Sequence, residues 1–181
     1  MKRILVPTDF SKHAEYALKV AAQIAKKNDG EIFLVHMLEL PTSGNDAINT
    51  AHELPELMFF KNAAVAKLDS LMDADYLEGV KISRIIQFEM AFDGIIKNGK
   101  AHDVDLIVMG SHGANGFQEM FIGSNTEKVV RNSDVPVLVI KREENLFNAS
   151  KFVFASDFSD EIKKPFEKVV EFANKFGSHL Y

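Results

Sequence analysis

The sequence predicts an α/β fold: a doubly wound, five-stranded parallel sheet in the order 3-2-1-4-5, with helices on both faces. Two observations carry this prediction. Short runs of Ile, Leu and Val alternate along the chain with longer segments whose apolar residues recur every three or four positions, as strands alternating with amphipathic helices do. The short runs are also almost continuously apolar, which is typical of parallel strands buried on both faces.

Each element of this fold can be placed on the sequence. Pro55 fits the first turn of a long helix, where a missing N–H costs least, whereas Gly94 and Gly99 weaken the helix that contains them. A polar loop is expected at residues 41–46. The expected strands cover residues 3–6, 31–37, 80–88, 104–109 and 136–141, and the expected helices cover residues 12–27, 55–72, 93–100 and 126–132.

Composition excludes several classes of protein. With 46% hydrophobic and 26% charged residues, the chain resembles an average globular protein. Its net charge of −5 argues against a nucleic-acid-binding surface. The absence of Cys excludes disulfides and thiol nucleophiles and fits a reducing compartment. Because we find neither a signal peptide nor an apolar run of about 20 residues, we expect a cytoplasmic protein without membrane or nucleic-acid partners.

A second copy of the opening pattern begins near the C-terminus. Residues 152–159 (FVFASDFS) echo residues 4–11 (ILVPTDFS), and a helical stretch ending near Gly177 matches the one ending at Gly30. We therefore expect a partial β-α-β repeat, which cannot bury its apolar face alone and is either truncated or completed by another chain. The expected parts are a nucleotide-binding domain at 1–142, a linker at 143–150, and the incomplete start of a second similar domain at 151–181.

A phosphate-binding loop is expected where the winding of the sheet reverses, between the first and fourth strands. Pro7-Thr8-Asp9 and Gly110-Ser111-His112-Gly113 would meet there, and the second segment continues through nine residues to Gly123-Ser124 and a helix. Glycines let the backbone approach a polyanion, and a helix N-terminus favours phosphate. Because residues 110–124 contain no Lys or Arg, main-chain donors, Ser124 and His112 would hold the phosphates.

With this loop, the chain resembles the universal stress protein family in its ATP-binding branch. The pattern G-x-x-G, nine residues, G-[ST] is met by Gly110, Gly113, Gly123 and Ser124. The resemblance covers about residues 1–142 and implies a bound ATP, with or without Mg²⁺. The segments that also resemble the family are residues 4–11, 104–109 and 136–140, and residues 151–181 resemble the start of a further such domain, as in tandem members.

The resemblance also implies roles for individual residues. Asp9 would contact the nucleoside, Met37 would meet the adenine, and the glycine loop with Asn125 would cradle ribose and phosphates. The sequence departs from the family at residues 89–92, which lack the small Gly or Pro turn often found after the third strand. The residues expected in the site are Pro7, Thr8, Asp9, Met37, Gly110, Ser111, His112, Gly113, Gly123, Ser124 and Asn125.

Structural explanations for these residues remain open beside the functional ones. Ser124 to Glu127 reads as a capping box, and Asp9 could cap the first helix, although Ser11 is better placed to do so. Met37 is equally the end of a buried strand. The six histidines have no metal-ligand spacing, so we expect no metal site, and we expect no catalytic residue.

Three functions follow from this pattern. The favoured one is an ATP-binding stress-response or signalling protein in which nucleotide occupancy stabilises a conformer or an oligomer that an unidentified protein partner recognises. An alternative is a slow ATPase or a phosphoryl or adenylyl transferase in which Asp9 holds Mg²⁺. Another is a nucleotide-free dimeric scaffold. A homodimer is expected in every case, because the strand at residues 137–140 would form an open apolar edge.

Overall fold

A computed structural model of the chain describes residues 1–39, 55–113 and 122–181. The described chain forms two compact units, Met1–Asn145 and Leu146–Tyr181. The polar loop predicted at 41–46 lies outside the described residues, as does the middle of the predicted phosphate loop. Across the described ranges, every helix falls short of the length and apolar character that a bilayer span requires.

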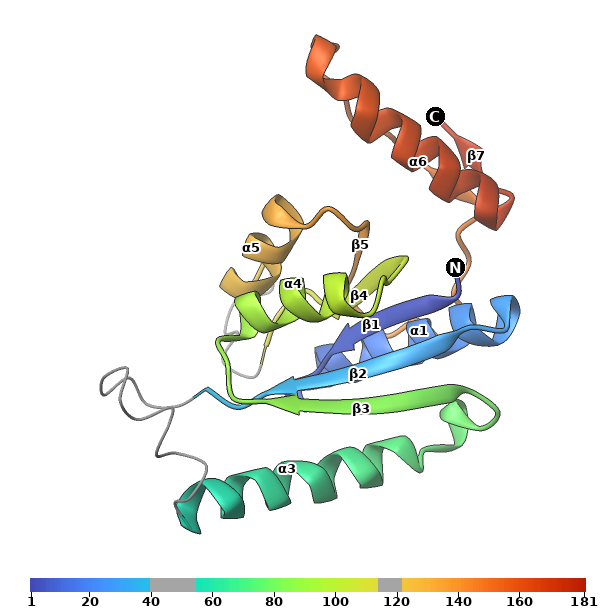
Figure 1. Cartoon of the computed structure of the whole chain (residues 1–181). Coiled ribbons are helices and arrows are strands. Elements are labelled where there is room, and N and C mark those ends of the chain that lie inside the picture. The colour runs from blue at the N-terminus through green and yellow to red at the C-terminus, as the bar shows by residue number, and fades with distance from the viewer. Residues whose placement is uncertain (40–54, 114–121) are drawn as a thin grey trace. The chain divides into compact units, whose positions relative to one another are not determined.

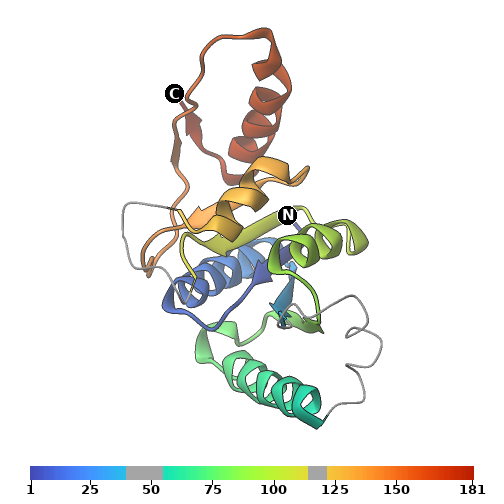
Figure 2. The same cartoon turned by 90° about the vertical axis from the view of Figure 1, so that its left-hand side faces the viewer.

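The first unit contains one parallel sheet with the strand order β3-β2-β1-β4-β5, which confirms the predicted fold. Helices α4 and α5 contact each other on one face, and α1 and α3 lie on the other (Figures 1 and 2). The elements are β1 (Arg3–Pro7), α1 (Lys12–Asn28), β2 (Glu31–Met37), α3 (Pro55–Met72), η2 (Asp75–Leu77), β3 (Lys81–Gln87), α4 (Ala91–Ala101), β4 (Leu106–Gly110), α5 (Ser124–Asn132) and β5 (Val137–Ile140).

The core explains why the strands read as continuous apolar runs. All five residues of β4 are buried, because the strand lies between β1 and β5 and is covered on both faces. One cluster joins Leu5, Val35 and Ile107 of three strands to Ile95 of α4 and Val129 of α5. This cluster ties α4 and α5 to the sheet, and the carboxyl ends of its strands carry the site described below.

Helix α1 begins and ends with local caps. The Ser11 hydroxyl accepts a hydrogen bond of 3.2 Å from the Ala14 N–H, so Ser11 is the N-cap, as predicted. At the other end, Asp29 adopts a left-handed conformation with φ of 48°, and the next amide, of Gly30, donates to the Ala25 carbonyl at 2.9 Å. Asp9 is thus not needed as a helix cap.

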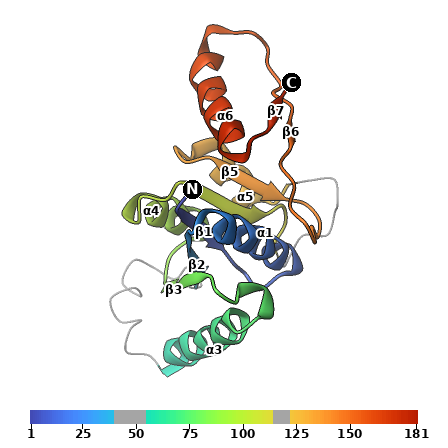
Figure 3. The same ribbon diagram turned by 90° about the vertical axis from the view of Figure 1, so that its right-hand side faces the viewer.

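The second unit is a short β-α-β segment, with the order of elements that the sequence predicted for residues 151–181 (Figure 3). Its two strands pair in parallel, and aromatic rings, among them Phe152 and Phe172, pack edge to face within it. That this unit is the start of a second domain stays a prediction. Its elements are β6 (Lys151–Phe152), η3 (Asp160–Ile162), α6 (Lys163–Phe176) and β7 (His179–Leu180).

Candidate functional site

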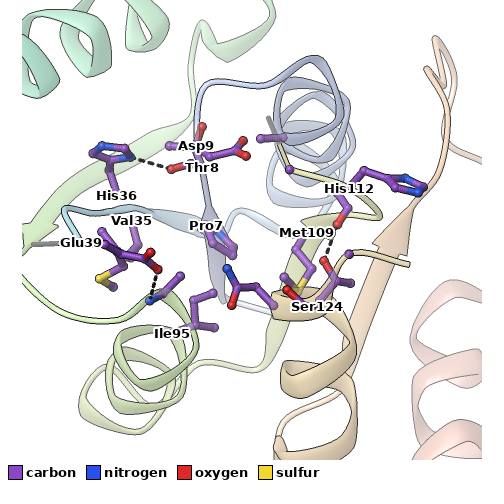
Figure 4. Close-up of a pocket in the computed structure, with 18 residues that line it drawn as sticks. Pro7, Thr8, Asp9, Val35, His36, Glu39, Ile95, Met109, His112 and Ser124 are labelled. Carbon is purple, nitrogen blue, oxygen red and sulfur yellow. Dashed lines mark hydrogen bonds between the residues drawn. The ribbon is translucent and has the colours of Figure 1, made fainter. Parts of the chain in front are cut away.

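A cavity of about 500 Å³ lies at the carboxyl edge of the sheet in the first unit (Figure 4). This volume is within the range of small-molecule sites. Its walls come from the ends of β1, β2 and β4 and from the first turns of α4 and α5. All of the residues that the sequence predicted for the site line this cavity, except Ser111.

The turn after β1 and the loop after β4 meet at the cavity. A Cβ atom added to Gly113 would lie 2.7 Å from Oδ2 of Asp9, so the two predicted segments are in direct contact. The Asp9 carboxylate is held by its Oδ1, which accepts a 3.0 Å hydrogen bond from the Ser11 N–H. The main chain before it is fixed to β2, because the Thr8 N–H donates to the Val35 carbonyl at 2.8 Å.

Gly110 and Gly113 have different structural roles in the loop. A Cβ atom on Gly110 would lie within 2.8 Å of the backbone of His13, so this glycine allows β4 to end directly against α1. At Gly113 the nearest atom is the end of a flexible side chain, that of Asp9. Gly110 is therefore required for the fold, whereas a side chain at Gly113 would chiefly fill the cavity.

The first turn of α5 differs from the prediction. The helix begins at Ser124 with Gly123 as its N-cap, and within the described residues no side-chain hydrogen bond caps it. The predicted capping box is therefore wrong, since Ser124 lies one position too late to be the cap. The Glu127 carboxylate pairs with Arg131 at 3.0 Å instead. Ser124 thus lines the cavity at a helix N-terminus without serving as its cap.

Ser111 and His112 secure the loop. Ser111 is fully buried, and its N–H donates to the Ile140 carbonyl of β5 at 2.9 Å. Its hydroxyl lies 2.8 Å from Nδ1 of His112, whose ring is 5.2 Å from that of His13. A nucleotide contact for Ser111 stays a prediction, and the structure gives the residue the clear role of anchoring the loop.

Apolar side chains form the part of the cavity between its polar ends. Val35, Ile95 and Met109 are at most 5% exposed and line the cavity. A Cβ atom on Gly94 would lie 2.4 Å from the Met37 sulfur, so the glycine that seemed to weaken α4 lets Met37 pack against it. These side chains form an apolar wall of the kind that ligand-binding pockets present to aromatic groups.

Several lining residues were missed by the sequence analysis. Nδ1 of His36 lies 2.8 Å from the Thr8 carbonyl oxygen, and Oε1 of Glu39 accepts a 3.0 Å hydrogen bond from the Ala91 N–H. Ala91 begins α4 two residues before the predicted start. It belongs to the stretch 89–92 that departs from the family pattern, and it lines the cavity. Only the position of Glu39 just beyond the end of β2 could have suggested it.

The fold and the cavity together define a doubly wound α/β protein with a small-molecule site at its topological switch point. The model of the universal stress protein family matches residues 1–141. The chain belongs to the universal stress protein family.

Relatives extend this match over most of the chain. Universal stress protein MJ0577 of Methanocaldococcus jannaschii is 31% identical over 157 residues, which cover 80% of this chain and 97% of that protein. The solved structure of MJ0577 superposes with a TM-score of 0.63 at 34% identity, covering 80% of this chain and 98% of that one. The similarity ends near the boundary between the two units.

Two further family structures were solved with adenine nucleotides. A universal stress protein in complex with cAMP has a TM-score of 0.54 at 19% identity, over 77% of this chain and 95% of that one. The Archaeoglobus fulgidus protein in complex with dAMP has a TM-score of 0.50 at 22% identity, over 77% of this chain and 98% of that one. At these identities the two structures share the fold with this chain.

Proposed function

We propose that this chain is an ATP-binding stress-response or signalling protein in which nucleotide occupancy stabilises one conformer or oligomer. The observation that carries the proposal is the contact between Asp9 and Gly113 at a glycine-lined cavity. The complexes of family members with cAMP and dAMP support an adenine nucleotide as the ligand class.

The proposed arrangement uses each wall of the cavity. The first turn of α5, with Gly123 and Ser124, would receive the phosphates through main-chain donors and the helix dipole. Asp9 would face the sugar, because a carboxylate accepts hydrogen bonds from ribose hydroxyls. The base would lie on the apolar surface that includes Met37 and Ile95. Mg²⁺ would accompany the phosphates without a dedicated protein site.

Binding is favoured over turnover because the loop lacks cations. Phosphoryl transfer depends on positioning and on charge neutralisation, usually by a Lys or Arg together with Mg²⁺, and residues 110–124 contain neither Lys nor Arg. The enzymatic alternative makes a different prediction. A phosphate-releasing activity that copurifies with the protein and is lost in Asp9→Ala would favour a slow ATPase or transferase.

A thermal-unfolding experiment tests nucleotide binding. A ligand present at 100 times its Kd stabilises the folded state by about 2.7 kcal/mol, so millimolar Mg-ATP should raise the melting temperature. Gly113→Val should abolish this increase, because the new side chain displaces Asp9 and fills the cavity. Its own melting temperature without ATP should stay close to that of the wild type. Unchanged melting of the wild type at millimolar ATP would refute the proposal.

The second unit supplies a matched control for Asp9. Asp157 accepts a 3.0 Å hydrogen bond from the Ser159 N–H, just as Asp9 does from Ser11, but Asp157 is in the other unit. Asp9→Ala should weaken ATP binding measured by calorimetry, whereas Asp157→Ala should leave the Kd unchanged. Equal effects of both substitutions would mean that Asp9 acts through the turn and not through the ligand.

Homodimerisation is a separate part of the proposal. The strand β5 is at the edge of the five-stranded sheet, where apolar residues favour pairing with a second copy. Light scattering of the full chain should give a dimer mass. A chain ending at Arg142 should remain dimeric if the edge of β5 suffices, and should become monomeric if residues 143–181 are needed.

A further inference from the structure

Two helix N-termini form opposite parts of the cavity wall. Helix α4 begins at Ala91 and helix α5 begins at Ser124, and both residues line the cavity. Glu39, which contacts Ala91, and Ser124 lie on opposite sides of the cavity in Figure 4. Since the N-terminus of a helix attracts anions, helix dipoles alone would let the phosphates of a nucleotide lie at either end.

Glu39 gives the α4 end of the cavity a negative charge that the α5 end does not receive from a capping side chain among the described residues. Its Oε1 accepts a 3.0 Å hydrogen bond from the Ala91 N–H, so a carboxylate already occupies the N-terminus of α4. At α5 the N-cap is Gly123, and no side chain in the described parts of the sequence caps the helix. A polyanion is therefore repelled from the α4 end and attracted to the α5 end.

The surroundings of Glu39 suit a flat base. Ala91 and Ile95 are four residues apart on α4, so they share one helix face, and both line the cavity. The main chain beside Glu39 is held in place, because the Leu38 N–H donates to the Gln87 carbonyl at 2.8 Å. A planar ring lying on this apolar face would bring its polar edge toward the Glu39 carboxylate.

We propose that Glu39 is a specificity-determining residue that directs the base to the α4 end and favours a base carrying an amino group on that edge. The inference rests on the proposed function. An ionised carboxylate accepts hydrogen bonds and donates none. It can therefore bind the 6-amino group of adenine, whereas it repels the 6-carbonyl oxygen of hypoxanthine or guanine.

The expected discrimination follows from the loss of one hydrogen bond to a charged group. Such a loss typically changes an equilibrium constant by about tenfold to a hundredfold. Glu39 is exposed to solvent, which places the expected effect at the lower end, about tenfold. ATP and inosine triphosphate differ at this position of the base, so they are suitable probes.

The test measures the Kd of both nucleotides by calorimetry for the wild type, Glu39→Gln and Glu89→Gln. The Gln side chain keeps an acceptor oxygen for the Ala91 N–H, but it is uncharged and also offers a donor. Glu89 pairs with Lys97 at 3.0 Å and is outside the cavity lining, so Glu89→Gln removes a nearby charge as a control. Melting without nucleotide should be the same for all three proteins.

The wild type and Glu89→Gln should bind ATP about tenfold more tightly than inosine triphosphate, and Glu39→Gln should reduce this ratio to about twofold or less. Equal affinities in the wild type, or an unchanged ratio in Glu39→Gln, would overturn the role of Glu39 and leave nucleotide binding intact. Failure of the wild type to bind either nucleotide would overturn the proposed function, and this inference with it.

Discussion

The chain contains the same turn twice, after β1 in the first unit and after β6 in the second. In both copies a Phe adopts a positive φ, of 64° and 60°, and the preceding Asp carboxylate accepts a 3.0 Å hydrogen bond from the following Ser N–H. In both, a hydroxyl accepts from the Phe N–H, at 3.1 and 2.9 Å. The matched pairs are Thr8 and Ser156, Asp9 and Asp157, Phe10 and Phe158, and Ser11 and Ser159.

The match continues along the whole β-α-β segment at a constant offset of 148 residues. The helix of the first copy is followed by Asp29 at φ 48° and that of the second by Gly177 at φ 64°. The next amide donates to Ala25 at 2.9 Å in one copy and to Ala173 at 3.0 Å in the other. The strand registers agree as well, since Arg3 pairs with Glu31, and Lys151 with His179.

Burial is what separates the two copies. Leu5 is 0% exposed, whereas its equivalent Val153 is 82% exposed. Strand β1 pairs with β2 and β4, while among the described residues β6 pairs with β7 alone. Short-range hydrogen bonds therefore suffice to specify the turn, whereas a ligand cavity also needs the glycine loop that packs beside the first copy.

The largest effect is expected from the strand side chains. Leu5→Ala should destabilise the first unit by about 3 kcal/mol, because it leaves a cavity in the core. Val153→Ala should change stability by less than about 0.5 kcal/mol, as is usual for an exposed side chain. Urea denaturation measures the first effect, and hydrogen exchange of the Phe154 amide, which donates to Tyr181, measures the second. Similar losses at both sites would mean that the second unit is packed in solution.

Most of the fold was predictable because each element carries its own local signal. The strand at residues 31–37 matches its predicted bounds, since a mainly apolar run that begins directly after Gly30 leaves little choice for its start. The start of α4 was missed by two residues, because its N-cap Met90 forms no side-chain cap and thus leaves no sequence signal. Capping at α5 was misassigned by one residue, a shift that the Ser-x-x-Glu spacing cannot detect.

The candidate site was predictable only where a sequence motif spans it. The loop glycines and Asp9 belong to such motifs. Glu39 and Ala91 are 52 residues apart, and their contact depends on how β2 and α4 pack, which leaves no periodic signal in either segment. Ser111 has the residue type of a binding residue, yet the pairing of β4 with β5 buries it. Tertiary packing therefore decides which polar residues reach the cavity.

The strained Phe residues should respond in opposite directions to glycine. A positive φ costs a Phe about 1–2 kcal/mol, which Gly avoids. Phe158 is 93% exposed, so Phe158→Gly should stabilise its turn. Phe10→Gly should destabilise the first unit, because the ring lies 4.5 Å from that of His36 and 5.3 Å from Nζ of Lys67. The two variants should differ by about 2 kcal/mol.

Unfolding of the first unit and hydrogen exchange across α6 would measure these two effects. Phe158→Leu is the matched control, since it keeps a bulky side chain at the strained position and should gain nothing. A loss of protection in Phe158→Gly would show that the exposed ring has a contact in solution, and the contrast between the copies would then be smaller than their burial indicates.

A smaller effect is expected at the helix caps. The Ser11 hydroxyl caps α1 by accepting from Ala14 at 3.2 Å, so Ser11→Ala should cost about 1 kcal/mol. Ser159 begins the η3 turn without a side-chain cap in the described second unit, and Ser159→Ala should be nearly neutral. Ser11→Asp, which restores an acceptor, should recover most of the loss. Chemical denaturation of the three variants checks this ranking.

The smallest effect is the pH response of the second turn. The Ser159 N–H donates to the Asp157 carboxylate and lowers the pKa of that group below its ordinary value. Because the folded pKa lies below the unfolded one, the bond contributes fully above the unfolded pKa, about 3.9, and its contribution is lost as the pH falls through the folded pKa. The turn should therefore loosen only in acid.

Carboxyl NMR titration of Asp157 between about pH 2 and 6 should give a midpoint below that of Asp in an unstructured peptide. Asp157→Asn keeps an acceptor oxygen without a titrating group, so the Ser159 amide should stay protected in acid. A midpoint equal to that of the peptide would mean that the second turn does not persist in solution. Short-range hydrogen bonds would then need the packing that surrounds the first copy in order to hold the same geometry.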